Sequence, residues 1–326
     1  MRILFAGSPA IAVPALEAVS RLADSAANGV RRLSGVLTNP DSPRGRHGKP
    51  EPTEVGAAAL ALSEKLIAQG HPPLPILKPE KLGSEAREAV AALKPDLLVS
   101  FAYGRIFGPK FLALFPLGGI NIHPCLLPKY RGPTPIPQAI LNGDAETGIT
   151  IQRLAVEMDS GDILVQERIP LTGRETTVSL SEEVSRRAAV MLPEALRGIA
   201  AGTLAGRPQD HSAASYCGLL SKDEGRIDWT KSAREIDAQI RAFTPWPLSW
   251  TMHGEQYLYI LAAEMVSGAV SEKAPGAILG IDKQRGILVQ TGDGVLAATM
   301  LQYRTKKALE WRAFLNGVRD FTGILY

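Results

Sequence analysis

The fold of this chain is decided by residues 96–128, which read DLLVSFAYGRIFGPKFLALFPLGGINIHPCLLP. The apolar run from Asp96 to Tyr103 predicts a buried strand. Gly118 and Gly119 then break the chain, and Ile120 to His123 predicts a second short strand. The rest of the sequence is interpreted outward from these two strands.

Two polar side chains occupy the end of the second strand. Side chains alternate faces along a strand, so Asn121 and His123 point the same way while Ile120 and Ile122 face the sheet. Pro124 ends the strand because it has no N–H to donate to the ladder. An amide and an imidazole therefore lie side by side at a carboxyl strand end, where open α/β sheets bind ligands. Such a pair can also merely cap a loop.

The flanking segments favour chemistry at this strand end. Residues 125–128 (Cys-Leu-Leu-Pro) are apolar and end in proline, so they predict a rigid pocket wall. Residues 158–162 (Met-Asp-Ser-Gly-Asp) form an acidic turn after the strand predicted at 148–156. An amide, an imidazole and a carboxylate are the groups needed to stabilise a tetrahedral intermediate and to move a proton.

Strand and helix patterns alternate through the first two thirds of the chain. Strands or extended pieces are predicted at 2–6, 33–38, 72–77, 97–101, 120–123, 148–156 and 163–169, and helices at 11–22, 54–69, 84–93, 136–141 and 177–199. This order predicts a doubly wound α/β domain, with a mostly parallel sheet and helices on both faces. Gly7 stands alone where a dinucleotide fingerprint needs three glycines, which disfavours a dehydrogenase.

The pattern changes after the helix predicted at 177–199. Residues 201–216 carry glycine, proline and serine without periodicity and predict a linker. Beyond them the sequence predicts helices at 234–243 and 310–315 and short strands at 249–253, 256–262, 276–281, 286–290 and 295–300. Short strands separated by glycine turns predict a small barrel. We therefore expect domains at 1–204 and 223–326, joined by a linker at 205–222.

The composition is that of an ordinary soluble globular protein of 326 residues, 21% charged and 45% hydrophobic. Cys125 and Cys217 are the two cysteines and form no CxxC motif, which argues against a zinc site and favours a reducing compartment. No apolar run approaches membrane-spanning length, and no signal peptide is recognisable, so we expect a cytoplasmic protein.

Positive charge gathers in one proline- and glycine-rich loop. Residues 31–49 contain five basic residues and one acidic residue, hence +4, whereas the whole chain carries +3. Charge alone leaves open whether this loop is a solvated surface or a grip for RNA phosphates. Residues 221–326 are nearly neutral, with 13 basic and 12 acidic residues, and there only Arg304, Lys306 and Lys307 cluster.

The chain carries four motifs in a characteristic order: Asn121-Ile122-His123, Leu126-Leu127-Pro128, Arg131-Gly132-Pro133 and Asp159-Ser160-Gly161-Asp162. In these motifs it resembles the N10-formyltetrahydrofolate-dependent formyltransferases. The resemblance extends over almost the whole chain, from MRILFAGSP at 1–9 and the basic loop at 38–49 to RIDW at 226–229 and RAFTPWP at 241–247. One departure is Cys125, which stands where the family usually has serine.

This resemblance implies a Rossmann-like, folate-binding catalytic domain and an OB-like, tRNA-binding C-terminal barrel. It implies transfer of the formyl group of 10-formyltetrahydrofolate to the α-amino group of initiator methionyl-tRNA, by a monomer, without a metal or a stable protein partner. Asn121 and His123 would donate to the oxyanion, and Asp159 would orient His123. Folate contacts are implied for Cys125, Leu126, Leu127 and Pro128, and tRNA contacts for Arg44, Arg46, Lys49, Arg304, Lys306 and Lys307.

Alternatives stay open at this point. An amino-sugar nucleotide formyltransferase would share the catalytic residues and a similar barrel, but the basic loop favours tRNA. A glycinamide ribonucleotide enzyme would not need residues 205–326. A non-catalytic RNA-binding module is disfavoured by the intact Asn121, His123 and Asp159. Asp162 is the rival carboxylate, and Cys125 is a rival nucleophile.

Overall fold

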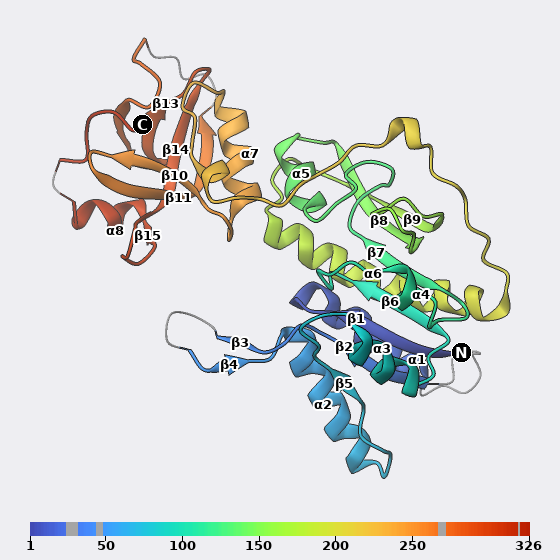
Figure 1. Cartoon of the computed structure of the whole chain (residues 1–326). Helices are drawn as coiled ribbons and strands as arrows, with labels where there is room; N and C mark the ends of the chain where they lie inside the picture. Colours follow the sequence, from blue (N-terminus) through green and yellow to red (C-terminus); the bar gives the residue numbers. More distant parts are fainter. Residues whose placement is uncertain (24–31, 44–47, 267–271, 319) are drawn as a thin grey trace. The chain divides into compact units, whose positions relative to one another are not determined.

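The computed structural model describes residues 1–23, 32–43, 48–266, 272–318 and 320–326 and divides into two compact units (Figure 1). The first unit comprises Met1–Pro135, Thr147–Ile169 and Ser181–Cys217. The second unit comprises Ile136–Glu146, Pro170–Leu180 and Gly218–Tyr326.

The first unit is built on a seven-stranded sheet of order β5-β2-β1-β6-β7-β8-β9. Its strands are β1 (Arg2–Gly7), β2 (Arg32–Leu37), β5 (Ile76–Leu77), β6 (Leu97–Phe101), β7 (Gly119–His123), β8 (Glu146–Arg153) and β9 (Ile163–Pro170). The neighbours from β5 to β7 pair in parallel, whereas β7 and β8 pair antiparallel. The prediction of a mostly parallel sheet is confirmed.

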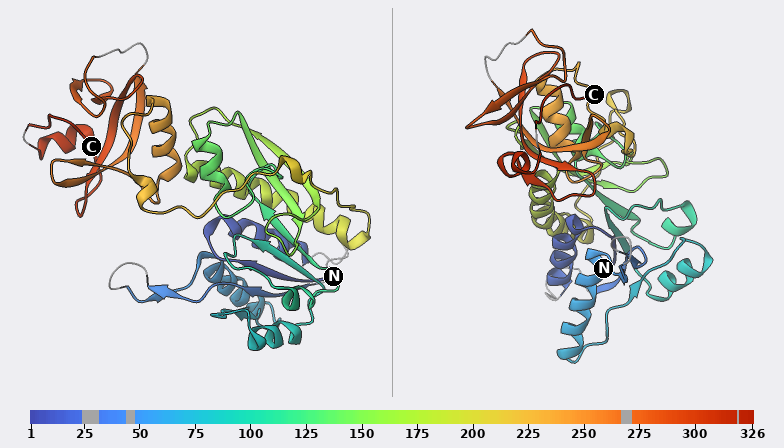
Figure 2. Two further views of the ribbon diagram at one scale, coloured as in Figure 1. Left: turned by 45° about the horizontal axis from the view of Figure 1, so that its top comes forward. Right: turned by 90° about the vertical axis from the view of Figure 1, so that its left-hand side faces the viewer.

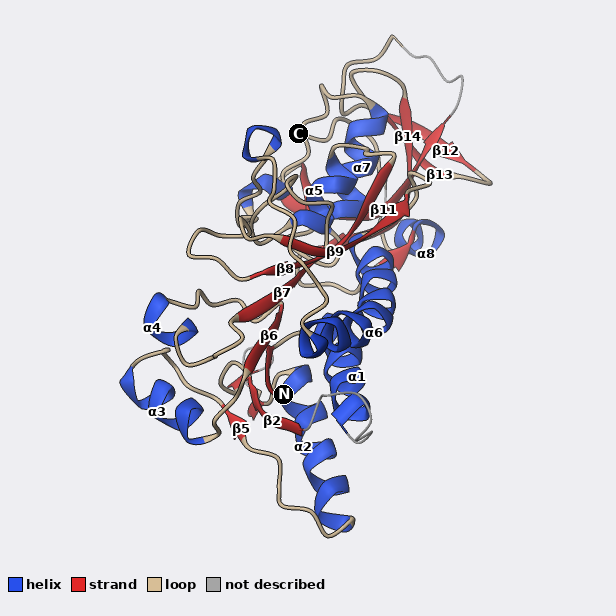
Figure 3. Cartoon of the chain, turned by 90° about the vertical axis from the view of Figure 1, so that its right-hand side faces the viewer, coloured by secondary structure: helices blue, strands red, loops and turns tan. Residues whose placement is uncertain are grey.

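Helices cover both faces of this sheet. The helical elements are η1 (Ala10–Ala12), α1 (Val13–Ala23), α2 (Glu54–Ala68), α3 (Ser84–Ala92), α4 (Pro109–Leu112) and α6 (Thr177–Ala201). Figure 3 shows α1 and α6 on one side of the strands and α3 and α4 on the other. Strand β6 is buried at all five positions because it is covered on both faces. This burial explains why residues 97–101 are continuously apolar instead of alternating.

The segment between β6 and β7 contains an element that the sequence did not predict. Tyr103, Phe107, Phe111 and Phe115 form a column of packed rings with successive centroid distances of 5.4, 5.4 and 5.8 Å. Helix α4 carries Phe111 in this column, and its four residues are too few to show helical periodicity. The column packs against Leu4 and Leu98 of the central strands and fixes the approach to β7.

Two other predictions need adjustment. The proline- and glycine-rich basic loop was predicted without secondary structure. In this region β3 (Ser42–Pro43) and β4 (Pro50–Glu51) form a short, exposed antiparallel pair. The strand expected to end at residue 156 ends at Arg153, because the chain turns back there and Arg153 N donates to Asp162 O over 2.9 Å. That turn places residues 155–158 in solvent.

The second unit is built on an antiparallel sheet. Its strands follow the order β10-β11-β14-β13-β12, with β15 beside β14. They are β10 (Ser249–His253), β11 (Gln256–Val266), β12 (Ile278–Asp282), β13 (Gly286–Gln290), β14 (Val295–Tyr303) and β15 (Leu309–Glu310); α5 (Pro135–Leu141), α7 (Ala233–Phe243) and α8 (Trp311–Asn316) are helices of this region. Figure 2 shows the sheet, in orange and red, as strongly curved.

The predicted barrel is open between its edge strands. Within the described residues no ladder joins β10 to β12. The C-terminal residues lie between them instead: Met252 N donates to Tyr326 O over 2.7 Å, and Leu325 N donates to Gly276 O over 2.8 Å. The antiparallel β domain is therefore confirmed, as a curved sheet whose edges are bridged by the chain end.

Helix α7 supplies one side of the core of the second unit. It begins with a capping box in which Ser232 and Glu235 exchange side-chain and backbone hydrogen bonds. Ile236 and Ile240 follow at helical spacing and pack with Leu258 and other apolar residues of the sheet. In the part of the chain that the structure describes, no helix is long and apolar enough to cross a membrane.

Candidate active site

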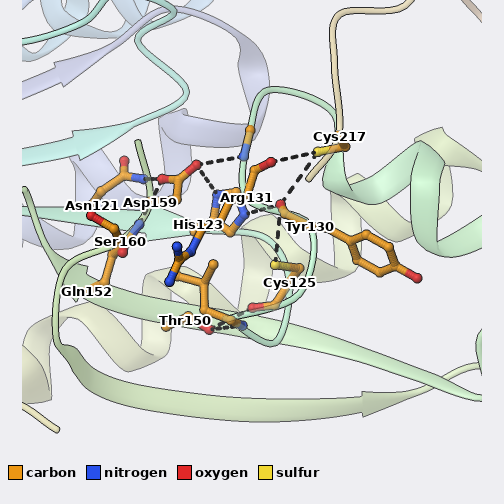
Figure 4. Close-up of polar contacts among 12 residues, drawn as sticks. Asn121, His123, Cys125, Tyr130, Arg131, Thr150, Gln152, Asp159, Ser160 and Cys217 are labelled. Atoms are coloured by element: carbon orange, nitrogen blue, oxygen red, sulfur yellow. Dashed lines mark hydrogen bonds and ion pairs between the residues drawn. The ribbon is translucent and has the colours of Figure 1, made fainter. Parts of the chain in front are cut away.

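The structure brings Asn121, His123 and Asp159 together at the end of β7 (Figure 4). Asn121 and His123 lie on β7 opposite Gln152 and Thr150 of β8. The loop after β8 then returns over the strand end and carries Asp159. Asn121 Nδ2 donates to Asp159 Oδ1 over 3.3 Å, and His123 Nδ1 lies 3.5 Å from Asp159 Oδ2.

The carboxylate of Asp159 is surrounded by donors. Oδ1 also accepts from Gln152 Nε2 over 2.8 Å, and Oδ2 accepts from the backbone N–H of Gly132 over 2.9 Å. The side chain is 11% exposed. An ionised carboxylate is an acceptor only, so this set of partners fits the charged form. The backbone of Asp159 has φ of 52°, a left-handed conformation that residues other than glycine adopt rarely.

The ring of His123 is buried between two acceptors. Its Nε2 lies 2.9 Å from the carbonyl oxygen of Tyr130, and its Nδ1 faces Asp159. A neutral imidazole has one N–H, so only the doubly protonated ring can donate to both partners. The arrangement places the imidazole beside the amide of Asn121, where a ring N–H can stabilise developing negative charge.

In the segment predicted to contact folate, two of the four side chains are partly accessible to solvent. Leu126 and Pro128 are half-buried, whereas Cys125 and Leu127 are buried. Cys125 Sγ donates to Lys129 O over 2.8 Å, which turns the thiol away from solvent. Burial first, and then the charge of Asp159, raises the pKa of Cys125 well above its ordinary value. A protonated, buried thiol is a poor nucleophile, which argues against the rival role of Cys125.

Asp162, the rival carboxylate, is exposed. Its backbone carbonyl closes the loop by accepting from Arg153 N, but the donors to Asp159 gather around the first aspartate of the pair. Among the described residues, no group of three or more His, Cys, Asp and Glu could hold a metal ion.

The predicted tRNA contacts fall in two separate regions. Lys49 is exposed next to β4 in the first unit, and Arg44 and Arg46 lie outside the described residues. Arg304, Lys306 and Lys307 are exposed in the connection between β14 and β15. The guanidinium of Arg304 lies 5.1 Å from the ring centre of Tyr257, a cation–π pair on the surface of the sheet.

Three residues that contribute to the site were not predicted as site residues. The N–H of Gly132 binds Asp159, although only its motif was noted. Gln152 binds Asp159 from β8, and the alternation of Thr150 and Gln152 along that strand was a usable signal. Gln209 donates to the carbonyl oxygen of Asp159 over 2.8 Å from the segment expected to be a linker. A lone glutamine in an aperiodic segment carries no signal of such a role.

Comparison with known families places both parts of the chain. Residues 1–196 match the formyl transferase family, and residues 219–319 match the formyl transferase C-terminal domain. Methionyl-tRNA formyltransferase of Treponema denticola is 50% identical over 327 residues, covering 98% of this chain and 98% of the relative. The enzymes of the same name from Treponema pallidum and Roseiflexus castenholzii are 46% and 43% identical, covering 97% and 98% of this chain and 96% of each relative.

Solved structures share the fold at lower identity. An N-formyltransferase from Helicobacter canadensis in complex with folinic acid and dTDP-3-aminofucose has a TM-score of 0.62 at 19% identity, covering 91% of this chain and 98% of that one. HypX from Aquifex aeolicus in complex with tetrahydrofolic acid has a TM-score of 0.60 at 18% identity, covering 97% of this chain. The chain spans 47% of the length of HypX. At these identities the likeness concerns the fold.

Proposed function

This chain belongs to the formyl transferase family, and from that membership we infer that it transfers a formyl group to the α-amino group of methionyl-tRNA. The observation that carries the choice of acceptor is the similarity to methionyl-tRNA formyltransferases, which reaches 50% identity and covers 98% of both chains. The product is N-formylmethionyl-tRNA, which serves translation initiation.

The formyl donor is a reduced folate, and we propose 10-formyltetrahydrofolate. The family relation and the tetrahydrofolate in the complex of HypX support a folate-dependent transfer. In this chain, half-exposed Leu126 and Pro128 offer apolar surface beside the polar groups of Asn121 and His123. A site that is mostly apolar with a few converging polar groups is what a folate ring system requires.

The bound formylfolate supplies a carbonyl carbon to which the amino nitrogen of the acceptor bonds, while the bond from that carbon to the folate nitrogen breaks. Asn121 stabilises the charge that develops on the carbonyl oxygen. Its amide nitrogen carries two hydrogens, of which one binds Asp159 and the other has no acceptor among the described residues. A donor of this kind contributes about 3–4 kcal/mol to transition-state stabilisation, or roughly 100- to 1,000-fold in rate.

His123 and Asp159 act as a charged pair next to this amide. The imidazolium of His123 supplies positive charge beside the oxygen, and Asp159 holds the ring in the orientation that Tyr130 O also requires. Asp159 further accepts the proton that the attacking amine loses, directly or through one water molecule. That proton then returns to the folate nitrogen as the leaving group departs. Attack by the amine is direct, with no covalent intermediate on Cys125.

We propose that the acceptor RNA is held through phosphate contacts of Arg44, Arg46 and Lys49 and of the cluster Arg304, Lys306 and Lys307. Support comes from the net charge of the loop, from the exposure of Lys49 and from the exposure of the whole second cluster. The amino-sugar nucleotide alternative shares the fold but has no such polyanion in its acceptor.

A competition assay tests the acceptor. The enzyme is incubated with labelled 10-formyltetrahydrofolate, methionyl-tRNA and an amino-sugar nucleotide in one reaction. We expect the label on the α-amino group of methionyl-tRNA, at a kcat/KM at least about 100-fold above that for the sugar, because specificity is the ratio of these constants. Label on the sugar amine would contradict the assignment.

A further inference from the structure

The segment between α6 and the second unit is tied into the first unit at both ends. Arg207 and Ile163 exchange backbone hydrogen bonds of 2.8 and 2.9 Å, and Arg131 N donates to Ser215 O over 2.8 Å. Cys217 N donates to Arg131 O over 2.9 Å. Gln209 lies between these anchors and is only 6% exposed. The segment therefore carries a buried amide to the catalytic loop.

Arg131 determines how this amide is oriented. Its guanidinium, 2% exposed, donates to Gln209 Oε1 from Nε over 3.2 Å and from Nη2 over 2.8 Å. A guanidinium has donors only, so the oxygen of Gln209 must face Arg131 and its NH₂ group must face the other way. Within the described part of the chain, the other polar partners of the Arg131 guanidinium are His211 and Tyr216, neither of which is a carboxylate.

The NH₂ group of Gln209 therefore points toward the loop that carries Asp159. Gln209 Nε2 donates to Asp159 O over 2.8 Å and to Gly161 O over 2.7 Å. One of these carbonyl groups belongs to Asp159, whose φ of 52° is the rare left-handed conformation, and the other lies two residues further along the loop. The loop before Asp159 is exposed from residue 155 to 158. The contacts of Gln209 therefore anchor the backbone that follows Asp159 from the buried side.

The side-chain amide of Gln152 links Gln209 to the carboxylate of Asp159. Gln152 Oε1 lies 3.3 Å from Gln209 Nε2, and Gln152 Nε2 donates to Asp159 Oδ1 over 2.8 Å. Each amide accepts from the side of Arg131 and donates toward Asp159. The buried cation and the catalytic anion are thus connected by two oriented dipoles, which strengthens each hydrogen bond in the series.

We propose that Gln209, oriented by Arg131, is a positioning residue for Asp159, and that it holds the carboxylate in the geometry that the formyl transfer inferred above requires. Gln209 acts through the backbone of Asp159 and through Gln152, without touching either substrate. Displacement of a catalytic group by about 1 Å can cost about 100-fold in rate, so loss of this contact acts on the chemical step.

The test compares Gln209→Met with a matched control, Gln239→Met. Gln239 is also 6% exposed and also donates to backbone carbonyl groups, those of Gly225 and Arg226 over 3.2 Å, but it lies in the second unit. Single-turnover formylation of methionyl-tRNA is measured at saturating substrates. We expect Gln209→Met to be at least about tenfold slower with both KM values within about threefold of wild type. Gln239→Met should be within about threefold in rate.

A second pair of variants separates positioning from general structure. In the background of Asp159→Asn, Gln209→Met should cost less than about twofold, because a residue that acts through Asp159 has nothing left to position. Gln209→Glu keeps the acceptor for Arg131 but turns an oxygen toward two carbonyl oxygens, so it should be at least as slow as Gln209→Met. Melting temperatures report folding, and Gln209→Glu replaces Gln209→Met in the comparison if the latter unfolds.

Three results would overturn the proposal: wild-type rate in Gln209→Met, full activity in Gln209→Glu, or the same fold loss with and without Asp159. Each presupposes that the wild-type enzyme formylates methionyl-tRNA. Failure of the wild type to do so would reject the proposed function instead, so the two claims fail separately.

Discussion

The isosteric change Asp159→Asn removes one charge and turns an acceptor into a donor. Oδ1 faces the NH₂ groups of Asn121 and Gln152, and Oδ2 faces the N–H of Gly132 and the ring of His123. Whichever way the new amide turns, its NH₂ group meets at least one fixed donor. On one side this is the backbone of Gly132, and on the other it is Gln152, whose oxygen is held by Gln209.

The magnitude follows from these contacts. A buried donor left facing a donor costs about 1–3 kcal/mol, so the loop either shifts or loses stability by this amount. Removing the negative charge also removes the partner that orients the imidazolium of His123. Together these effects remove transition-state stabilisation of about 3–4 kcal/mol, so we expect the rate to fall by about 100- to 1,000-fold.

The assay is single-turnover formation of N-formylmethionyl-tRNA at saturating formylfolate. Asp162→Asn is the matched control, because Asp162 is exposed and lies three residues further along the same loop. We expect Asp162→Asn to stay within about threefold of wild type. A rate for Asp159→Asn within about fivefold of wild type, or a larger loss in Asp162→Asn, would refute the assignment of catalysis to the first aspartate.

Other predictions concern the remaining polar groups. Asn121→Ala should lower turnover by about 100-fold or more, and combining it with His123→Ala should cost less than the product of the two, since both act on one oxyanion; simple multiplication of the effects in rate measurements would indicate separate steps. Cys125→Ser should keep activity within about threefold. Because burial raises the pKa of Cys125, alkylation of this thiol in the folded protein should become faster only at a pH above the pKa of a free thiol. Rapid alkylation at pH 7 would contradict this. Arg46→Ala and Lys49→Ala should each flatten the log–log salt dependence of tRNA KM by about one unit, whereas unchanged slopes would show that the loop is only a solvated surface.

Much of the first unit could be predicted because its strands are buried on both faces. Apolar runs mark two of these strands, at residues 97–101 and 120–123. The helix patterns between the strands then restrict the ways in which the strands can be connected. In β7 the period of two placed Asn121 and His123 on one face, as the structure has it. Asp159 was predicted from a sequence motif and not from periodicity, because its position over β7 depends on how the loop between β8 and β9 turns back.

What could not be predicted depends on contacts between distant residues. Gln209 meets Arg131 across 78 positions of sequence, in a segment that has no periodicity and looks like a linker. Its role follows only from the packing of that segment along the first unit. The edge of the second unit shows the same limit, since the bridging of β10 and β12 by residues 324–326 requires the chain end to fold back on both strands.

The most direct test of the central claim is the single-turnover rate of N-formylmethionyl-tRNA formation by wild type and by His123→Ala. His123 is buried and touches both Asp159 and Tyr130, so the melting temperature of the variant is measured alongside. We predict that the folded variant is slower by about 100-fold or more, while its KM for tRNA changes by less than about threefold. Equal rates for the two proteins would show that formyl transfer does not proceed at the site formed by Asn121, His123 and Asp159.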